Sequence, residues 1–189
     1  RFLKKQYGEE VKVIFAGPCI GKKTEADNFK DLVEIAITFK DLKMWMEKEG
    51  IQPENEKGEE IRLSNYKGKK IVLYFYPKDM TSGCTAQACN LRDNYAELRA
   101  HGYEVIGVSV NDAKSHQKFI EKNELPFTLI ADTDKKLVEQ FGVWGEKSMY
   151  GRKYMGTFRT TFIINEEGVI ERIISPKEVK TKEHAQQIL

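Results

Sequence analysis

The sequence predicts an α/β protein built on a mixed β-sheet, and three observations lead to this class. Strand-like and helix-like patterns alternate from Gly58 to about Phe141. The apolar run at residues 71–76 has the length and composition of a buried strand. Near the end of the chain, two apolar segments flank the turn at residues 165–168, as in a hairpin. Since alternating strands and helices favour parallel pairing and a hairpin is antiparallel, we expect one sheet with both kinds of pairing.

The chain divides into two sections, of which the second is this domain. In the first, residues 11–16 and 32–37 are strand candidates, and a helix capped by Thr38 follows them. Polar, turn-rich residues 53–60 mark the boundary. We therefore expect a short β-β-α appendage at residues 1–57 and the α/β domain at residues 58–189.

The elements of the domain follow from patterning and turn residues. We expect a short edge strand at 60–63, a strand at 71–76, a helix from about 84 to 100, a strand at 104–110, a helix at 113–122 and a strand at 127–131. A helix capped by Asp132 or Asp134 should then end near Phe141, and an irregular stretch with four glycines follows at 142–157. Strands at 160–164 and 169–174 and a last helix from Lys182 complete the domain. The helix at 84–100 carries one apolar stripe, which predicts the face that it buries.

Composition excludes several classes of function. The 189 residues include 31 Lys and Arg against 29 Asp and Glu, so the net charge of +2 gives no electrostatic case for nucleic acid or an anionic membrane as the main partner. No apolar run approaches the ~20 residues that span a bilayer, and the first residues lack a signal-peptide pattern. Because the chain starts at Arg1, we expect a fragment or a processed product. Three cysteines, an odd number, argue against a secreted disulfide scaffold and favour the reducing cytoplasm.

Cys84 lies where the buried strand, ended by Pro77, gives way to a helix. Unpaired amides and the positive end of the helix dipole favour the thiolate there, which is the reactive form of cysteine. Thr81, three residues earlier, can place its hydroxyl beside the sulfur, where it can accept a hydrogen bond from an attacking oxygen acid or donate one to the thiolate. A guanidinium would stabilise the thiolate further and bind the oxygens of a substrate, and the candidate is Arg159.

Cys89 is the second thiol of the same helix, one position off the apolar stripe. Residues five apart in an intact helix have Cα atoms about 8.7 Å apart, whereas a disulfide needs less than ~7 Å. A bond between Cys84 and Cys89 therefore requires the first turns of the helix to unwind. The pair predicts a redox cycle with a local unfolding step.

Three other interpretations of the cysteines compete with a redox-active pair. Zinc needs about four ligands, and His101, His116 and His184 are scattered singly. Cys89 can be an inert buried thiol, since free cysteine often is. A thioredoxin-type dithiol prefers Cys-x-x-Cys, and the gap here is longer.

Pro77, Thr81 and Cys84 match the Pro-x-x-x-Thr-x-x-Cys motif of peroxiredoxins. Residues 79–85 followed by Cys89 resemble the bacterioferritin comigratory protein subfamily, also called the Q type. The likeness runs from about residue 58 to the end of the chain and includes residues 141–147 and 159–162. The family usually opens with an Ala-Pro-Asp-Phe-Thr-Leu strand, which this chain lacks.

This resemblance implies a thioredoxin-like fold and a thiol peroxidase for hydrogen peroxide and organic hydroperoxides, with no metal, haem or flavin. It implies that Cys84 is the peroxidatic cysteine and Cys89 the resolving one. Thr81 and Arg159 would complete the peroxide pocket, with Pro77 shielding it. The implied partner is thioredoxin or a similar dithiol, and the expected state is a monomer.

Residues 18–25 resemble the Pro-Cys-x-x-Lys-x-x-Glu motif of the large C-terminal domain of iron-only hydrogenases. Carried over, Cys19 would ligate an iron–sulfur cluster, and Lys22 and Glu25 would serve the active cluster and proton transfer. The other cysteine motifs of that family are missing, and a four-iron cluster takes four thiolates. We expect a non-functional fragment. An iron–sulfur protein and a non-catalytic thioredoxin-fold module stay as the alternatives to a peroxidase.

Overall fold

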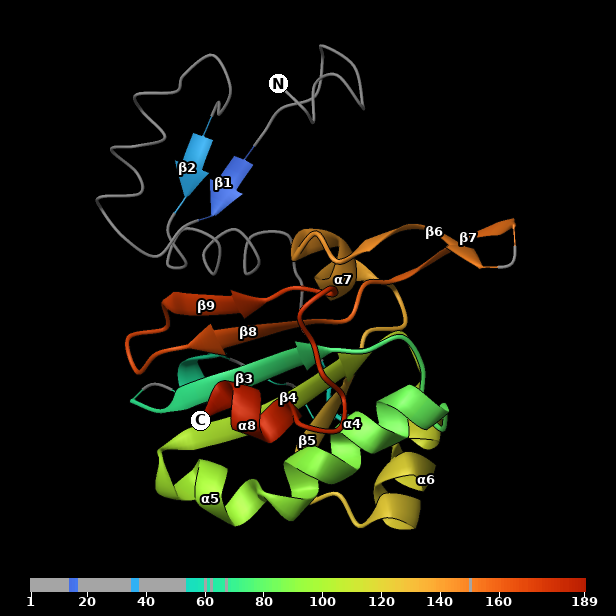
Figure 1. Cartoon of the computed structure of the whole chain (residues 1–189). Helices are drawn as coiled ribbons and strands as arrows, with labels where there is room; N and C mark the ends of the chain where they lie inside the picture. The colour runs from blue at the N-terminus through green and yellow to red at the C-terminus, as the bar shows by residue number, and fades with distance from the viewer. Residues whose placement is uncertain are drawn as a thin grey trace.

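The computed structural model describes residues 14–16, 35–37, 54–59, 61, 63–66, 68–149 and 151–189. Its centre is a five-stranded sheet of order β5-β4-β3-β8-β9 (Figure 1). The strands are β3 (Lys70–Phe75), β4 (Tyr103–Ser109), β5 (Thr128–Ala131), β8 (Thr160–Ile164) and β9 (Ile170–Ile174). β3, β4 and β5 are parallel, whereas β8 pairs antiparallel with both β3 and β9. The predicted mixed sheet is confirmed.

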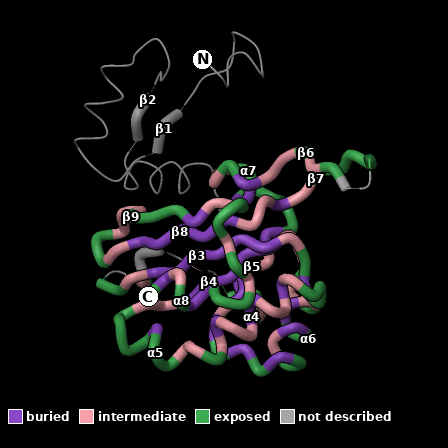
Figure 2. Tube along the Cα trace, in the orientation of Figure 1, coloured by how far each residue is buried: buried purple, intermediate pink, exposed green. Residues whose placement is uncertain are grey.

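The middle strand β3 has helices on both faces. From Ile71 onward every residue of β3 is buried, and successive side chains point to opposite faces. Val72 and Tyr74 pack with residues of α4 (Ser82–Asp93), α5 (Tyr95–Ala100), α6 (Ala113–Asn123) and α8 (His184–Ile188). Ile71, Leu73 and Phe75 pack instead with α7 (Lys136–Gln140) and the 3₁₀ helix η1 (Leu63–Tyr66). In Figure 2 the buried trace accordingly follows the central strands. None of the described helices is long and apolar enough to cross a membrane.

The helix predicted from about residue 84 to residue 100 is present at these positions, but it is not continuous. It begins at Ser82 and is divided at Asn94 into α4 and α5. The side-chain amide of Asn94 donates to the Asn90 carbonyl at 2.8 Å, and the backbone N–H of Asn94 reaches the same oxygen at 3.2 Å. Asn side chains compete with the helical ladder in this way. The apolar stripe survives the break, since Cys84, Ala88 and Leu91 of α4 and Leu98 of α5 are all buried.

The predicted irregular stretch at 142–157 is also wrong. It forms a hairpin of β6 (Trp144–Met149) and β7 (Arg152–Thr157), which pair only with each other and project from the domain (Figure 1). Glycine is disfavoured in strands, and its frequency here suggested a loop. Two of these glycines, Gly145 and Gly156, instead face each other across the hairpin.

Other expected elements are close to their predicted positions. The N-cap residue of α7 is Lys135 rather than Asp132 or Asp134, but the Asp132 carboxylate still accepts from the backbone N–H groups of Leu137 and Val138 in the first turn, at 3.0 and 2.8 Å. The edge strand expected at 60–63 is not formed at Leu63, which opens η1 instead; residues 60 and 62 lie outside the described residues.

The first section is described only in part. β1 (Ile14–Ala16) and β2 (Ile35–Ile37) pair in parallel, at the two predicted strands. The helix after Thr38 and the residues Cys19, Lys22 and Glu25 lie outside the described residues. Residues 54–59 attach to the sheet, because Asn55 bridges Ile130 and the Ala131 N–H donates to the Glu54 carbonyl at 3.1 Å. The division of the chain at residue 57 stays a prediction.

Candidate active site around Cys84

Cys84 lies in the first turn of α4, two residues after its start at Ser82. Pro77 follows β3 and is half-buried, and the exposed Thr81 is the N-cap residue of the helix. The Thr81 carbonyl accepts the Thr85 N–H at 2.8 Å, which closes the first turn over the cysteine. The thiol itself is 1% exposed. The Cys84 sulfur is therefore buried at a helix N-terminus, where the helix dipole favours negative charge.

Arg159 reaches this sulfur from the turn between β7 and β8. Its Nη2 donates to Cys84 Sγ at 3.1 Å, although the two residues are far apart in sequence. Its Nη1 donates to Oε1 of Gln87, which is buried one turn further along α4. A guanidinium in this position stabilises the thiolate. Gln87 was missed by the sequence analysis, although its spacing of three residues from Cys84 placed it on the same helix face.

Thr81 does not hydrogen-bond to the sulfur. Its Oγ1 donates instead to the Lys78 carbonyl at 3.0 Å. The hydroxyl proton is thus engaged, and its oxygen keeps lone pairs that can accept a hydrogen bond from a hydroperoxide. The geometry agrees with one of the two roles that the sequence suggested, which is acceptance rather than donation to the thiolate.

Cys89 has different surroundings. It is half-buried, and its Sγ lies 3.8 Å from Oδ1 of Asn123, the last residue of α6. The Nδ2 of Asn123 donates to the Phe119 carbonyl at 2.9 Å, and this contact orients the amide oxygen toward the thiol. Both Cys84 and Cys89 are free thiols in an intact helix. The structure is therefore in the reduced arrangement, in which the two sulfurs are kept apart.

Comparison with known proteins identifies the family. The AhpC/TSA family profile matches residues 38–173. Peroxiredoxin Bcp of Escherichia coli K12 is 44% identical over 135 residues, which cover 71% of this chain and 85% of the relative. Peroxiredoxin Bcp of Bacillus subtilis 168 is 46% identical over 140 residues, covering 74% and 87%. The chain belongs to the AhpC/TSA family, as a Bcp or Q-type peroxiredoxin.

Solved structures agree with this assignment. Peroxiredoxin Q of Xanthomonas campestris superimposes with a TM-score of 0.68 at 33% identity, over 74% of this chain and 87% of that one. A bacterioferritin comigratory protein of the same species, studied for its alkyl peroxide reduction activity, gives 0.67 at 32% identity over 74% and 87%. The predicted thioredoxin-like fold and Q-type resemblance are confirmed. The hydrogenase resemblance of the first section stays a prediction.

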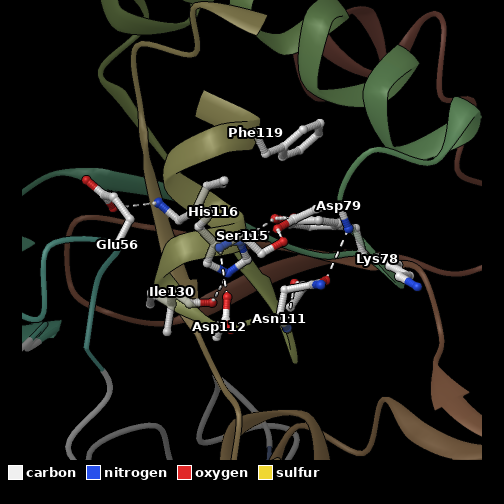
Figure 3. A network of polar contacts seen from close by, with 12 residues as sticks. Glu56, Lys78, Asp79, Asn111, Asp112, Ser115, His116, Phe119 and Ile130 are labelled. Atoms are coloured by element: carbon white, nitrogen blue, oxygen red, sulfur yellow. Dashed lines mark hydrogen bonds and ion pairs between the residues drawn. The ribbon is translucent and has the colours of Figure 1, made fainter. Parts of the chain in front are cut away.

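In this peroxiredoxin a buried polar network anchors the loop that leads to Cys84 (Figure 3). The Asp79 carboxylate accepts from Tyr76 Oη at 2.7 Å, Ser115 Oγ at 2.6 Å and His116 Nδ1 at 2.9 Å. Its backbone N–H donates to Asn111 Oδ1 at 3.1 Å. Burial raises the pKa of Asp79, but the hydrogen bonds from His116 and Ser115 outweigh it and leave the pKa below its ordinary value. Asp79 is thus a charged anchor five residues before Cys84.

The same network fixes the histidine that the sequence left unassigned. Both ring nitrogens of the fully buried His116 face acceptors, Nδ1 the Asp79 carboxylate and Nε2 the Ile130 carbonyl at 3.0 Å. The network therefore joins the loop after β3 to α6 and β5. Met80, directly after the anchor, has φ of +60°, an uncommon value outside glycine. The chain turns sharply there before it enters α4.

An aromatic floor lies on the same side of the sheet as α4. Tyr74 and Tyr76 stack with ring centroids 5.4 Å apart. The Tyr74 hydroxyl is buried without a hydrogen-bond partner among the described residues. Burial raises the pKa of Tyr74 well above its ordinary value, and the nearby Cys84 charge raises it further. Tyr74 therefore stays protonated beside Cys84.

Within the part of the chain that the structure describes, no three His, Cys, Asp or Glu side chains gather closely enough to hold a metal ion. The side-chain donor at Cys84 is the Arg159 guanidinium, which suits an oxygen-containing substrate.

Proposed function

We propose that this peroxiredoxin reduces hydrogen peroxide and organic hydroperoxides with Cys84 as the peroxidatic cysteine. The observation that carries the proposal is the 3.1 Å contact between Arg159 and Cys84 in the first turn of α4. The contact sets a positive charge beside the sulfur, which suits a nucleophile that reacts as a thiolate, and it brings guanidinium donors to where the peroxide oxygens would bind. The likeness to characterised Bcp and Q-type proteins supports the same chemistry.

In the first step the Cys84 thiolate attacks the terminal peroxide oxygen. The sulfur becomes a sulfenic acid and water or an alcohol leaves. Arg159 orients the peroxide, and the Thr81 oxygen accepts its O–H hydrogen bond. Pro77 covers the pocket from the side of β3.

In the second step Cys89 condenses with the sulfenic acid to give an intramolecular disulfide and water. α4 has to unwind first, because its intact geometry keeps the two Cα atoms about 8.7 Å apart. Unwinding breaks the contact of Cys89 with Asn123 and that of Cys84 with Arg159. Thioredoxin or a similar dithiol then reduces the disulfide by exchange. We place this monomeric cycle in the cytoplasm, where such reductants are found.

The decisive experiment is peroxide-dependent turnover with thioredoxin, thioredoxin reductase and NADPH. Cys84→Ser is expected to abolish NADPH consumption. Cys89→Ser is expected to consume about one equivalent of peroxide and then stop, because the sulfenic acid lacks its intramolecular partner. Turnover by Cys84→Ser equal to that of the parent would refute the assignment.

A further inference from the structure

The turn between β3 and α4 contains a peptide group that is held at both of its ends. The Asp79 N–H donates to Oδ1 of Asn111 at 3.1 Å (Figure 3). The Lys78 carbonyl, which belongs to the same peptide group, accepts a hydrogen bond from Thr81 Oγ1 at 3.0 Å. Because a peptide group is planar, fixing its N–H also fixes the direction of its carbonyl. Asn111 therefore sets the position of the acceptor that the Thr81 hydroxyl uses.

The side chain of Asn111 is itself fixed. It follows β4, and its Oδ1 also accepts a hydrogen bond from Ser109 Oγ at 3.1 Å. The backbone N–H of Asn111 donates to the same hydroxyl at 3.2 Å, and Ser109 is fully buried at the end of β4. Since both partners of Oδ1 are donors, the amide oxygen and not the amide nitrogen faces them. Asn111 thus ties the turn before α4 to the neighbouring strand of the sheet.

The Asp79 side chain holds the same turn through a second set of contacts. It is almost fully buried, and its carboxylate accepts hydrogen bonds from Ser115 and His116 of α6 at 2.6 and 2.9 Å. Met80 then adopts φ of +60°, a value that residues other than glycine seldom adopt. Tertiary contacts therefore hold this turn in a backbone conformation that its own sequence does not favour.

The exposed Thr81 depends on this arrangement. Its side chain makes no capping hydrogen bond to α4, although Thr81 is the N-cap residue. Its hydroxyl proton is directed to the Lys78 carbonyl, so the oxygen presents its lone pairs to a donor. A hydroperoxide carries such a donor in its O–H group. If the peptide group were free to rotate, the hydroxyl would lose its partner and would no longer present an acceptor in a fixed direction.

We propose that Asn111 and Asp79 are positioning residues that act through Thr81 to orient the hydroperoxide beside Cys84. This inference rests on the peroxidase function proposed above. Asn111 and Asp79 hold the peptide group, the peptide group orients the Thr81 hydroxyl, and the hydroxyl accepts from the O–H of the substrate. Their contribution is therefore specific to oxidants with a hydroperoxide O–H group. Reactions of the same sulfur that need no hydrogen-bond acceptor do not depend on it.

The test compares two reactions of Cys84. Hydrogen peroxide has an O–H group that needs an acceptor, whereas iodoacetamide alkylates the sulfur with loss of iodide and needs none. Oxidation is followed by stopped-flow kinetics, and alkylation by mass spectrometry of the peptide that contains Cys84. Asn111→Leu removes the acceptor of the Asp79 N–H at similar size. It should slow oxidation by about three- to tenfold, as the loss of one net hydrogen bond implies. Alkylation should stay within about 1.5-fold of the parent, because it uses no such hydrogen bond.

A double-mutant cycle shows whether Asn111 acts through Thr81. Thr81→Val removes the hydroxyl and should slow oxidation at least as much as Asn111→Leu does. In the Thr81→Val background, Asn111→Leu should cause no further loss, because two residues that act through one contact are not additive. Asp79→Asn keeps the size of the side chain but removes its charge. It should show the same peroxide-selective loss, and it decides the question if Asn111→Leu does not fold.

The matched control is Asn165→Leu, in the turn between β8 and β9, where the side-chain oxygen also accepts backbone N–H groups. It should react like the parent with both reagents, and a peroxide-selective loss in this control would count against the proposal. Additive losses in the cycle, equal losses with both reagents, or full oxidation rates in Asn111→Leu and Asp79→Asn would overturn it. An inactive parent would instead refute the peroxidase function itself.

Discussion

Cys84 and Cys89 lie in one helix but in contrasting environments. Cys84 is sealed from solvent and contacts a guanidinium at 3.1 Å. Cys89 is half-buried and its closest polar contact is a neutral amide oxygen at 3.8 Å. The first arrangement sets a positive charge against the sulfur, whereas the second is a weak neutral contact from which the sulfur is easily displaced. Surroundings, not residue type, therefore distinguish the two sulfurs, and the attacking and resolving roles that we propose for them rest on this difference.

Removing the Arg159 guanidinium should make the surroundings of the two cysteines more alike. We expect this change to have the largest of the predicted effects. Arg159→Met removes the charged contact to Cys84 and the donors for peroxide oxygens. Oxidation of Cys84 by hydrogen peroxide should slow by about 10²–10³-fold, as when an electrostatic donor is lost from an active site. Stopped-flow kinetics at neutral pH measure it. Arg152→Met, on the exposed part of the hairpin, is the control. A rate within about threefold of the parent would mean that Arg159 is not part of the reacting site.

Helix α4, which carries Cys89, contacts α8. Because α8 contains the buried His184, the stability of the folded protein should depend on pH. The Nε2 atom of buried His184 forms a hydrogen bond with Thr161 Oγ1 at 2.9 Å. Burial lowers the pKa of His184 from 6.5 to about 4, so the folded protein holds it neutral. Between these values the unfolded chain binds the proton and the folded chain does not, so stability falls as pH falls from about 6.5 to about 4.

The expected contribution of His184 is roughly 2–3 kcal/mol lost between pH 7 and pH 4.5. Urea unfolding at the two pH values measures this loss. His184→Gln should keep a partner for Thr161 and reduce the pH dependence by that amount. His101→Gln, at an exposed position, should leave the dependence as in the parent. If His184→Gln retains the full pH dependence, the lowered pKa is not the cause.

A smaller effect should come from loosening α4 next to Cys89. Asn90 ties α4 to α8, because its Nδ2 donates to the Lys182 carbonyl at 2.9 Å and its Oδ1 accepts the Ala185 N–H at 2.8 Å. Asn90→Ala should ease unwinding by about 1 kcal/mol, the usual net value of a hydrogen bond. Disulfide formation after the peroxide step should then be about fivefold faster, as that energy implies.

The matched control is Asn165→Ala, in the turn between β8 and β9. Asn165, like Asn90, makes two hydrogen bonds to backbone groups. Its Oδ1 accepts the N–H groups of Glu167 at 3.1 Å and Val169 at 2.9 Å. Asn165→Ala should lower global stability by a similar amount without changing the rate of disulfide formation. Equal rates in Asn90→Ala and the parent would show that the α4–α8 contact does not open during resolution.

The amino-acid sequence alone determined the local features of this protein. The apolar run of β3, the hairpin β8–β9 and the stripe of α4 are periodic or turn-marked, so short-range patterns suffice to find them. The positions of Cys84 and Cys89 in one helix, and the need for that helix to open, also follow from spacing. The hairpin β6–β7 escaped detection because its glycines are explained only by the side chains of Lys147 and Phe158 that lie over them.

The tertiary structure decided what depends on contacts between distant segments. Sequence distance cannot show that Arg159 meets Cys84, nor that Asp79 accepts from Ser115 and His116 of another helix. Such contacts arise from how β3, β8 and α6 pack, and buried polar groups then take whichever partners lie within reach. The position of Cys84 at a helix N-terminus was therefore encoded locally, whereas its guanidinium contact and the anchored loop before it exist only in the folded chain.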